Sequence, residues 1–346
     1  MSKVSELPKE CLWRIEKEEN TYAVNAMCQR IQLESDSESE FQPGHGDVLE
    51  VTNNGKVICL HAGASSSALI FVTNQCNSNC IMCPDSVKQR TRQNTITIEY
   101  LLEYVSLLPT DLTHIDITGG EPTLLKENLP VLIEKALDQA GKAEILMLSN
   151  GRSFAVRKYC QLFYPFADRK FKIEIPIHSA SGEKHDFIAG CQNSFIQTIA
   201  GIHNLLDGGV EIGIRIVVSK LNYTELNSIV DFIHYEFPDI KYINLMGMEV
   251  MGNAWKNREM VWEELENLKP YLQGTLVRCF KWGIEPRLYN FPLCLFDQKY
   301  WYNYRKSISD YKIRYFEDCE KCREREQCGG FFASTFHHTK YKVRVQ

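Results

Sequence analysis

The chain has 346 residues, of which 44% are hydrophobic and 24% are charged, a balance that disfavours disorder and allows one large core or two smaller ones. Its formal net charge of −5 argues against a nucleic acid partner, because nucleic-acid-binding surfaces are basic. Residues 1–20 show no signal-peptide pattern, and no stretch approaches the roughly 18 to 20 apolar residues of a membrane span. We therefore expect a cytoplasmic protein with no membrane partner.

Residues 1–65 are predicted to form an N-terminal β extension. The acidic, serine-rich stretch at residues 34–46 is expected to be a solvated loop. The stretch at residues 47–60 is expected to be a hairpin with Asn54 and Gly55 in its turn. A leader peptide added to its edge is one interpretation, and a plain covering hairpin is the simpler one.

From residue 66 onward, short apolar runs alternate with longer amphipathic ones, which is typical of βα units around a parallel sheet. Strands are expected at 68–73, 114–118, 144–149, 171–177, 211–219 and 242–247, and helices at 97–108, 127–141, 194–209, 222–237 and 258–272. This α/β pattern predicts a partial (β/α)6 barrel over 66–275, with active residues at the C-terminal strand ends. A flat, doubly wound sheet has the same local pattern.

Thirteen cysteines are present, and in a cytosolic chain of this length closely spaced cysteines indicate metal or redox chemistry more often than disulfides. Cys76, Cys80 and Cys83 follow the first predicted strand with the spacing C-x3-C-x2-C. Three thiolates on a four-iron cluster leave one iron without a protein ligand, which suits a catalytic cluster. A zinc site completed by a histidine and an accidental grouping are the alternatives.

The second predicted strand runs directly into Gly119, Gly120 and Glu121. Two glycines allow the backbone to approach a ligand closely, and the glutamate accepts hydrogen bonds from an ammonium group. Because this turn comes one βα unit after the cysteine loop, we expect both to face the same cavity.

The motifs CNSNCIMC, at 76–83, and GGE, at 119–121, resemble those of the radical S-adenosylmethionine (SAM) superfamily over about residues 66–250. The resemblance implies a partial (β/α)6 barrel in which the three cysteines hold a [4Fe-4S] cluster and SAM chelates its open iron. It also implies that the Gly-Gly-Glu turn contacts the methionine amine of SAM.

The resemblance implies further SAM contacts at other loops and strand ends. Met82 stands where the family usually has an aromatic residue against adenine. Ser149 and Asn150 match the third-strand motif whose side chains enter the cavity, with a plain helix cap as the alternative.

The later strands supply the remaining contacts by the same resemblance. Pro176 stands where the family often has a polar residue near the ribose, so His178 or Ser179 is the substitute. Arg215 is expected to point toward the SAM carboxylate, with a surface ion pair as the alternative, and Met246 lies in the segment that meets adenine through its backbone.

A second set, Cys294, Cys319, Cys322 and Cys328, falls in the C-terminal region 276–346. Four thiolates at this spacing suit a closed zinc site or a fully ligated iron-sulfur cluster. The C-x2-C-x5-C core resembles SPASM or twitch extensions, which carry auxiliary [4Fe-4S] clusters. Phe332 occupies the place of a further SPASM cysteine, so one auxiliary cluster fits better than two.

Several other stretches resemble the C-type radical SAM maturase of the His-Xaa-Ser peptide system over residues 66–334. They are LSNGRSFA, KHDFIAG, LMGMEVMGNAW, LYNFPLCLFD, SISDYK and the terminal CGGFFAS. The resemblance implies a ribosomal precursor peptide as substrate and a second radical SAM protein as partner.

The predicted function is therefore that of a peptide maturase. A flavodoxin or ferredoxin reduces the cluster, SAM is cleaved to a 5'-deoxyadenosyl radical, and that radical abstracts a hydrogen from the peptide. The alternatives are radical chemistry on a metabolite or nucleoside and, from another class, a nonenzymatic iron-sulfur sensor. A sensor has no need of the Gly-Gly-Glu turn.

Overall fold

The computed structural model describes residues 11–17, 21–33, 42–52 and 54–346, so most of the predicted acidic loop at 34–46 lies outside the described residues. Contacts within the chain group its residues into two compact units. The first unit comprises the described residues up to Gln75, Gln93–Leu148 and Leu162–Lys172, and the second comprises Cys76–Arg92, Ser149–Gln161 and Ile173–Gln346. The domain boundaries at residues 65 and 275 stay a prediction.

The first unit begins with an antiparallel sheet in the order β3-β2-β1-β4-β5. Its strands are β1 (Cys11–Lys17), β2 (Thr21–Val24), β3 (Arg30–Leu33), β4 (Val48–Val51) and β5 (Val57–His61). Strands β4 and β5 confirm the predicted hairpin, since Val51 pairs with Val57 across the turn. Trp13 and Ile15 fill the core of this sheet. Strands β2 and β3 have only four residues each, too few for a clear alternation in the sequence.

Strands β6 to β13 form a parallel sheet, in which each strand pairs with the strands that precede and follow it along the chain. Its strands are β6 (Ser67–Phe71), β7 (His114–Thr118), β8 (Glu144–Leu148), β9 (Phe171–Pro176), β10 (Glu211–Val217), β11 (Tyr242–Met246), β12 (Glu285–Tyr289) and β13 (Tyr304–Arg305). The unbroken order confirms the partial-barrel prediction, because the order in a doubly wound sheet reverses at a switch point. The first six strands match the predicted ones.

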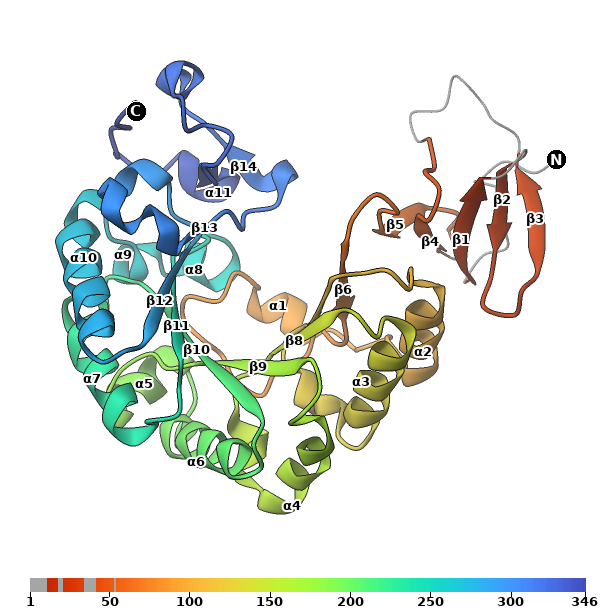
Figure 1. Ribbon diagram of the computed structural model, residues 1–346, viewed down its shortest axis with the longest axis horizontal. Coiled ribbons are helices and arrows are strands. Elements are labelled where there is room, and N and C mark those ends of the chain that lie inside the picture. The colour runs from red at the N-terminus through yellow and green to blue at the C-terminus, as the bar shows by residue number, and fades with distance from the viewer. Residues whose placement is uncertain (1–10, 18–20, 34–41, 53) are drawn as a thin grey trace. The chain divides into compact units, whose positions relative to one another are not determined.

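The helices are α1 (Val87–Arg90), α2 (Ile98–Leu107), α3 (Asn128–Gln139), α4 (Arg157–Cys160), α5 (Gly182–Ala189), α6 (Ser194–Asp207), α7 (Leu226–Glu236), α8 (Gly252–Lys256), α9 (Arg258–Val261), α10 (Leu265–Lys281) and α11 (Ala333–Phe336). In the second unit, α6, α7 and α10 cover one face of strands β10 to β12 (Figure 1). None of the described helices is long and apolar enough to cross a membrane.

The predicted helices at 97–108, 127–141, 194–209 and 222–237 are confirmed as α2, α3, α6 and α7. The prediction of one helix over 258–272 is wrong. Helix α9 ends at Val261, and α10 begins at Leu265 and continues to Lys281. The break lies where Glu264 has an extended backbone and its carboxylate accepts the backbone N–H of Lys340 at 3.0 Å, a long-range contact that no local pattern reveals. In the C-terminal region, β14 (Ile313–Arg314) and β15 (Phe331–Phe332) form a short antiparallel pair.

Candidate active site

The cysteine loop, residues 76–83, belongs to the second unit and is held through its backbone by the end of helix α5. The N–H of Asn79 donates to the carbonyl of Ala189, and the N–H of Ile81 donates to that of Ile188, each at 3.0 Å. The last carbonyls of a helix have no partner within the helix, so the helix end and the loop satisfy each other. Gly190 follows with φ of 59°, and a Cβ there would lie 2.2 Å from the Asn79 carbonyl oxygen.

Two asparagines from the α8–α9 segment hold the same loop. Asn253 Nδ2 donates to the Cys80 carbonyl at 3.0 Å, and Asn257 Nδ2 donates to the Ile81 carbonyl at 2.9 Å. Each bond joins residues 173 or more positions apart in the chain. Sequence reasoning missed both asparagines as functional residues, although they belong to or closely follow the stretch LMGMEVMGNAW that carried the family resemblance.

Arg90, the last residue of α1, places a buried positive charge against the loop. Its guanidinium donates to the Ser78 carbonyl at 2.8 Å and to Asn79 Oδ1 at 2.6 Å. Within the described residues it has no carboxylate partner, and its Nε makes no hydrogen bond. A buried cation without a counter-ion is costly, so the surroundings of Arg90 favour a negatively charged group. No sequence motif pointed to this residue.

The thiols of the loop influence one another's ionisation. Burial, reinforced by the negative charges of Cys83 and Cys76, raises the pKa of Cys80 to about 12. Burial also raises the pKa of Cys83, and the positive charge of Arg90 opposes both shifts. No three His, Cys, Asp or Glu side chains reach metal-ligand geometry in the part of the chain that the structure describes. In chemical type, three thiols beside a buried cation suit a soft metal centre that binds thiolates.

The turn after β8 also reaches the cysteine loop. Asn150 Nδ2 donates to Asn77 Oδ1 at 2.6 Å, and Arg152 donates to the Asn77 carbonyl and, at 3.1 Å, to Ser78 Oγ. Ser149 Oγ accepts the N–H of Gly151 at 3.1 Å, a contact within the turn. Asn150 therefore links the third predicted strand end to the cysteine loop, and Arg152 is a second loop contact that the sequence did not single out.

The Gly-Gly-Glu turn lies in the first unit, directly after β7. A Cβ on Gly119 would lie 2.4 Å from the Thr73 carbonyl oxygen, and one on Gly120 would lie 2.1 Å from that of Gln75. The close approach that these glycines permit is therefore to the backbone at residues 73–75. Glu121 is fully buried, and its Oε1 accepts the N–H and the hydroxyl of Thr123 at 3.1 and 2.8 Å.

Arg215 and Met246 meet in the second unit. Arg215 Nε lies 3.0 Å from Met246 Sδ and 3.5 Å from Oε2 of Glu174, whose side chain is buried. Arg215 thus makes an ion pair, which was the predicted alternative to a SAM contact. The partner is a buried carboxylate, however, and not one at the surface. A contact of Arg215 with the SAM carboxylate stays a prediction.

His178 and Ser179 are both buried after β9. The His178 ring lies 5.0 Å from that of His185, and burial holds the pKa of His178 well below its usual range and lowers that of His185 to about 4. Both imidazoles are therefore neutral near pH 7. Ser179 Oγ accepts the N–H of Ser181 at 3.1 Å.

Met82 packs on the side of the cysteine loop that faces α8 and α9. Its neighbours in this apolar cluster include Ile188, Val250 and Val261. Its expected contact with adenine stays a prediction.

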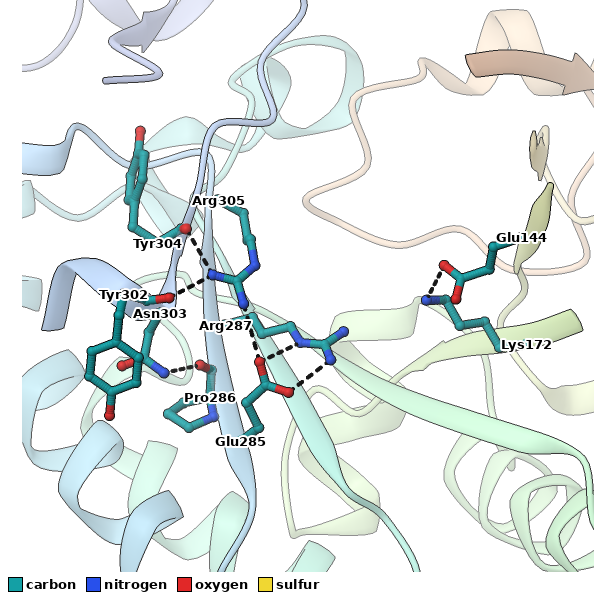
Figure 2. Close-up of polar contacts among 9 residues, drawn as sticks. All are labelled: Glu144, Lys172, Glu285, Pro286, Arg287, Tyr302, Asn303, Tyr304 and Arg305. Atoms are coloured by element: carbon teal, nitrogen blue, oxygen red, sulfur yellow. Dashed lines mark hydrogen bonds and ion pairs between the residues drawn. The ribbon is translucent and has the colours of Figure 1, made fainter. Parts of the chain in front are cut away.

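Strands β12 and β13 carry a group of paired charges, shown in Figure 2. Glu285 accepts from Arg287 at 2.8 Å and from Arg305 at 3.2 Å, and Arg287 holds the pKa of Glu285 below its usual range. Arg287 also stacks over the Tyr242 ring at 3.9 Å. These charges explain why β12 escaped prediction, since its sequence lacks an apolar run. In the first unit, Lys172 pairs with Glu144 (Figure 2).

The four C-terminal cysteines line one pocket. The sulfur of Cys328 accepts the backbone N–H groups of Leu293 and Gly330, each at 3.3 Å, and the Tyr341 hydroxyl lies 3.7 Å from the sulfur of Cys294. Burial is the main cause that raises the pKa values of Cys319 and Cys328, and the charges of neighbouring cysteines add to it. The structure therefore brings together the set that the sequence predicted.

Comparison with known sequences identifies the domain. Residues 70–233 match the radical SAM superfamily. The chain is 25% identical over 181 residues to the GTP 3',8-cyclase of Tolumonas auensis, covering 51% of this chain and 52% of that protein. It is 23% identical over 195 residues to the Fe-coproporphyrin III synthase of Methanosarcina barkeri, covering 56% and 47%. The chain thus spans about half the length of these curated relatives.

Comparison with solved structures shows the same fold. SuiB of Streptococcus suis, bound to its precursor peptide SuiA, gives a TM-score of 0.52 at 12% identity and covers 84% of this chain and 72% of that one. Native anSMEcpe, with bound AdoMet and a Kp18Cys peptide, gives a TM-score of 0.50 at 15% identity; the match covers 64% of this chain and 63% of that one. These likenesses and the strand order show the fold, and the sequence match assigns residues 70–233 to the radical SAM superfamily as a domain of this chain.

Proposed function

We propose that this chain is a radical SAM maturase that modifies a ribosomally made peptide. When bound, a [4Fe-4S] cluster with SAM on its open iron supplies reductive cleavage of SAM and the radical that abstracts a hydrogen atom. The protein supplies the ligands, the orientation of substrate and cofactor, and the exclusion of water. The observation that carries the proposal is the anchored three-cysteine loop with the buried guanidinium of Arg90 beside it.

The residues of the loop fit such a cluster in charge and in chemical type. Three thiolates on a [4Fe-4S] core leave a net negative charge, and Arg90 is a buried cation that lacks a carboxylate partner among the described residues. The bonds from Asn253 and Asn257 hold the backbone of the loop that carries the three cysteines. Glu121, buried after β7, is the proposed acceptor for the SAM ammonium group.

We further propose that the C-terminal set holds one auxiliary [4Fe-4S] cluster. Four thiols around one pocket make a complete donor set. The two N–H groups directed at Cys328 stabilise a thiolate. A structural zinc ion uses the same donors and is the alternative occupant.

Two lines of support favour a peptide as the substrate. The fold likeness to SuiB extends over 84% of this chain. The stretches quoted above resemble the C-type maturase of the His-Xaa-Ser system, which acts with a precursor peptide and a second radical SAM protein. The matches to GTP 3',8-cyclases keep a nucleotide or other metabolite as the second candidate.

The decisive experiment is the intact mass of the proposed precursor peptide after anaerobic coexpression. The peptide is expressed with the chain alone, with the chain and the proposed second radical SAM protein, and with a variant in which Cys76, Cys80 and Cys83 are alanine. We expect a defined mass change, such as the loss of two hydrogens, that the triple variant abolishes.

An unchanged peptide mass in a preparation that still forms 5'-deoxyadenosine contradicts the peptide proposal and directs the search to metabolites. The absence of 5'-deoxyadenosine from a preparation whose three-cysteine cluster is intact contradicts the enzyme assignment itself and favours the sensor.

A further inference from the structure

Helices α8 and α9 present an unusual outer surface, which we call the α8–α9 face. Three large apolar side chains on this segment are exposed to solvent: Met251 (46%), Trp255 (44%) and Met260 (44%). The guanidinium of Arg258 stacks over Trp255 at 4.6 Å. Tryptophan, methionine and arginine are enriched at the centres of protein–protein interfaces. An exposed group of this composition indicates a docking surface.

A basic pocket adjoins this face. Lys220, Arg258 and Lys340 line it, with Glu259 as the only carboxylate among its lining residues. Arg258 lies 3.6 Å from that carboxylate, and the side chain of Lys340 makes no hydrogen bond or ion pair with any other described residue. The pocket therefore carries a net positive charge on a chain whose formal net charge is −5. Its partner is expected to be acidic.

The inner side of the same segment touches the cysteine loop. Asn253 and Asn257 donate to loop carbonyls. Val250 and Trp262, which line the basic pocket, also belong to the apolar cluster that contains Met82 and contacts Cys80. One layer of side chains thus separates the positively charged surface from the proposed cluster ligands.

We propose that the α8–α9 face and its basic pocket dock an acidic one-electron carrier protein of the flavodoxin or ferredoxin type. This inference rests on the proposed function, because the carrier's role is to reduce a cluster held by the cysteine loop. The reduced carrier loses one electron, the oxidised cluster gains it, and no bond or proton is exchanged. A folded acidic protein fits better than an extended peptide, since α8 and α9 are helical and offer no strand edge for peptide pairing.

The test uses the full chain, reconstituted anaerobically, with a purified flavodoxin as the probe. Affinity is measured by titration at low and high salt, and the rate of cluster reduction is followed by stopped-flow absorbance with reduced flavodoxin or with dithionite. The variants are Lys340→Glu and Arg258→Glu. Lys158→Glu serves as the control, because Lys158 is also an exposed lysine of the second unit and lies on α4.

We expect each charge reversal on the face to weaken flavodoxin binding about tenfold at low salt, with a smaller difference at high salt, and to slow reduction by flavodoxin in proportion. Reduction by dithionite should not change, and Lys158→Glu should bind as the wild type does.

Wild-type affinity in both reversed variants, with the cluster intact, overturns the docking proposal alone. If the reversed variants bind flavodoxin as the wild type does but modify the peptide poorly with dithionite as reductant, the face binds the peptide. That result also overturns the docking proposal. A wild-type chain that assembles no cluster on Cys76, Cys80 and Cys83 overturns the proposed function and this inference with it.

Discussion

At the scale of single residues, the buried guanidinium of Arg90 is the clearest electrostatic feature beside the cysteine loop. It donates two hydrogen bonds to the loop, and its charge opposes the rise in the pKa values of Cys80 and Cys83. A cation in this position stabilises thiolates and any added electron on a metal centre that they hold. Removing the charge should therefore make that centre harder to reduce.

We expect Arg90→Gln to lower the midpoint potential of the loop cluster by about 60 mV, which corresponds to a tenfold less favourable one-electron reduction. Arg90→Lys keeps the charge and should stay close to the wild-type value. The measurement is a redox titration followed by electron paramagnetic resonance, in a background where the four C-terminal cysteines are alanine. Equal midpoint potentials in the glutamine variant and the wild type would show that Arg90 holds the loop without tuning the cluster.

Sequence reasoning singled out the candidate ligands but not the residues that support them, and the difference is physical. Cys76, Cys80 and Cys83 are recognisable because the chemistry dictates both residue type and local spacing. Asn253 and Asn257 lie 173 or more positions along the chain from the loop residues that they contact. Each makes a hydrogen bond to a backbone carbonyl, a group that every residue has. No spacing rule marks such a contact in one sequence.

At the scale of elements, the end of helix α5 is built into the cysteine loop. The loop N–H groups satisfy the last α5 carbonyls, and Gly190 allows the two backbones to approach. Gly190 has φ of 59°, a left-handed conformation that disfavours other residues. The comparable Gly283 has φ of 68°, but a Cβ there would meet no atom within 4 Å.

These two glycines make a matched pair of variants. Gly283→Ala should lower the free energy of unfolding by about 1 to 2 kcal/mol, the cost of a left-handed conformation for a residue with a Cβ. Gly190→Ala should lower it by more, because the added methyl also meets the Asn79 carbonyl, and it should release iron from the loop cluster more readily. Chemical denaturation and iron analysis measure the two effects. Equal losses in both variants would show that the contact with Asn79 has no separate role.

The strands and helices that were predicted are those with a clear local pattern. The first six strands of the parallel sheet are apolar runs between turn residues, and α2, α3, α6 and α7 follow amphipathic sequences. Strand β12 stayed hidden because Glu285 and Arg287 interrupt its apolar residues and are satisfied by each other and by Arg305. Ion pairs formed across strands leave no periodic signal.

At the scale of the whole molecule, both cysteine sets belong to the second unit, although more than 200 residues separate Cys83 from Cys294. The parallel strand order predicted from the sequence accounts for the core of the domain, whereas the grouping of the four C-terminal cysteines depends on β14, β15 and their loops. Each set has its own supporting contacts. We therefore expect the two sites to load independently.

The wild type should hold about eight iron atoms per chain after anaerobic reconstitution, and alanine variants of either cysteine set should hold about four. The variant of the loop cysteines should keep an iron-sulfur absorbance while losing formation of 5'-deoxyadenosine. Iron, zinc and sulfide analyses make the measurement. If the variant of the loop cysteines is colourless and contains zinc, the C-terminal cysteines hold a structural zinc ion and the proposal of an auxiliary cluster is wrong.

The contacts of Asn253 and Asn257 with the cysteine loop also impose an order on biosynthesis. The three cysteines leave the ribosome long before the segment that fixes their backbone has been made. During that interval the thiols stand on an incompletely supported loop, open to oxidation and to adventitious metals. Insertion of the correct cofactor is therefore a step that follows synthesis of α8 and α9, and expression under low oxygen should favour it.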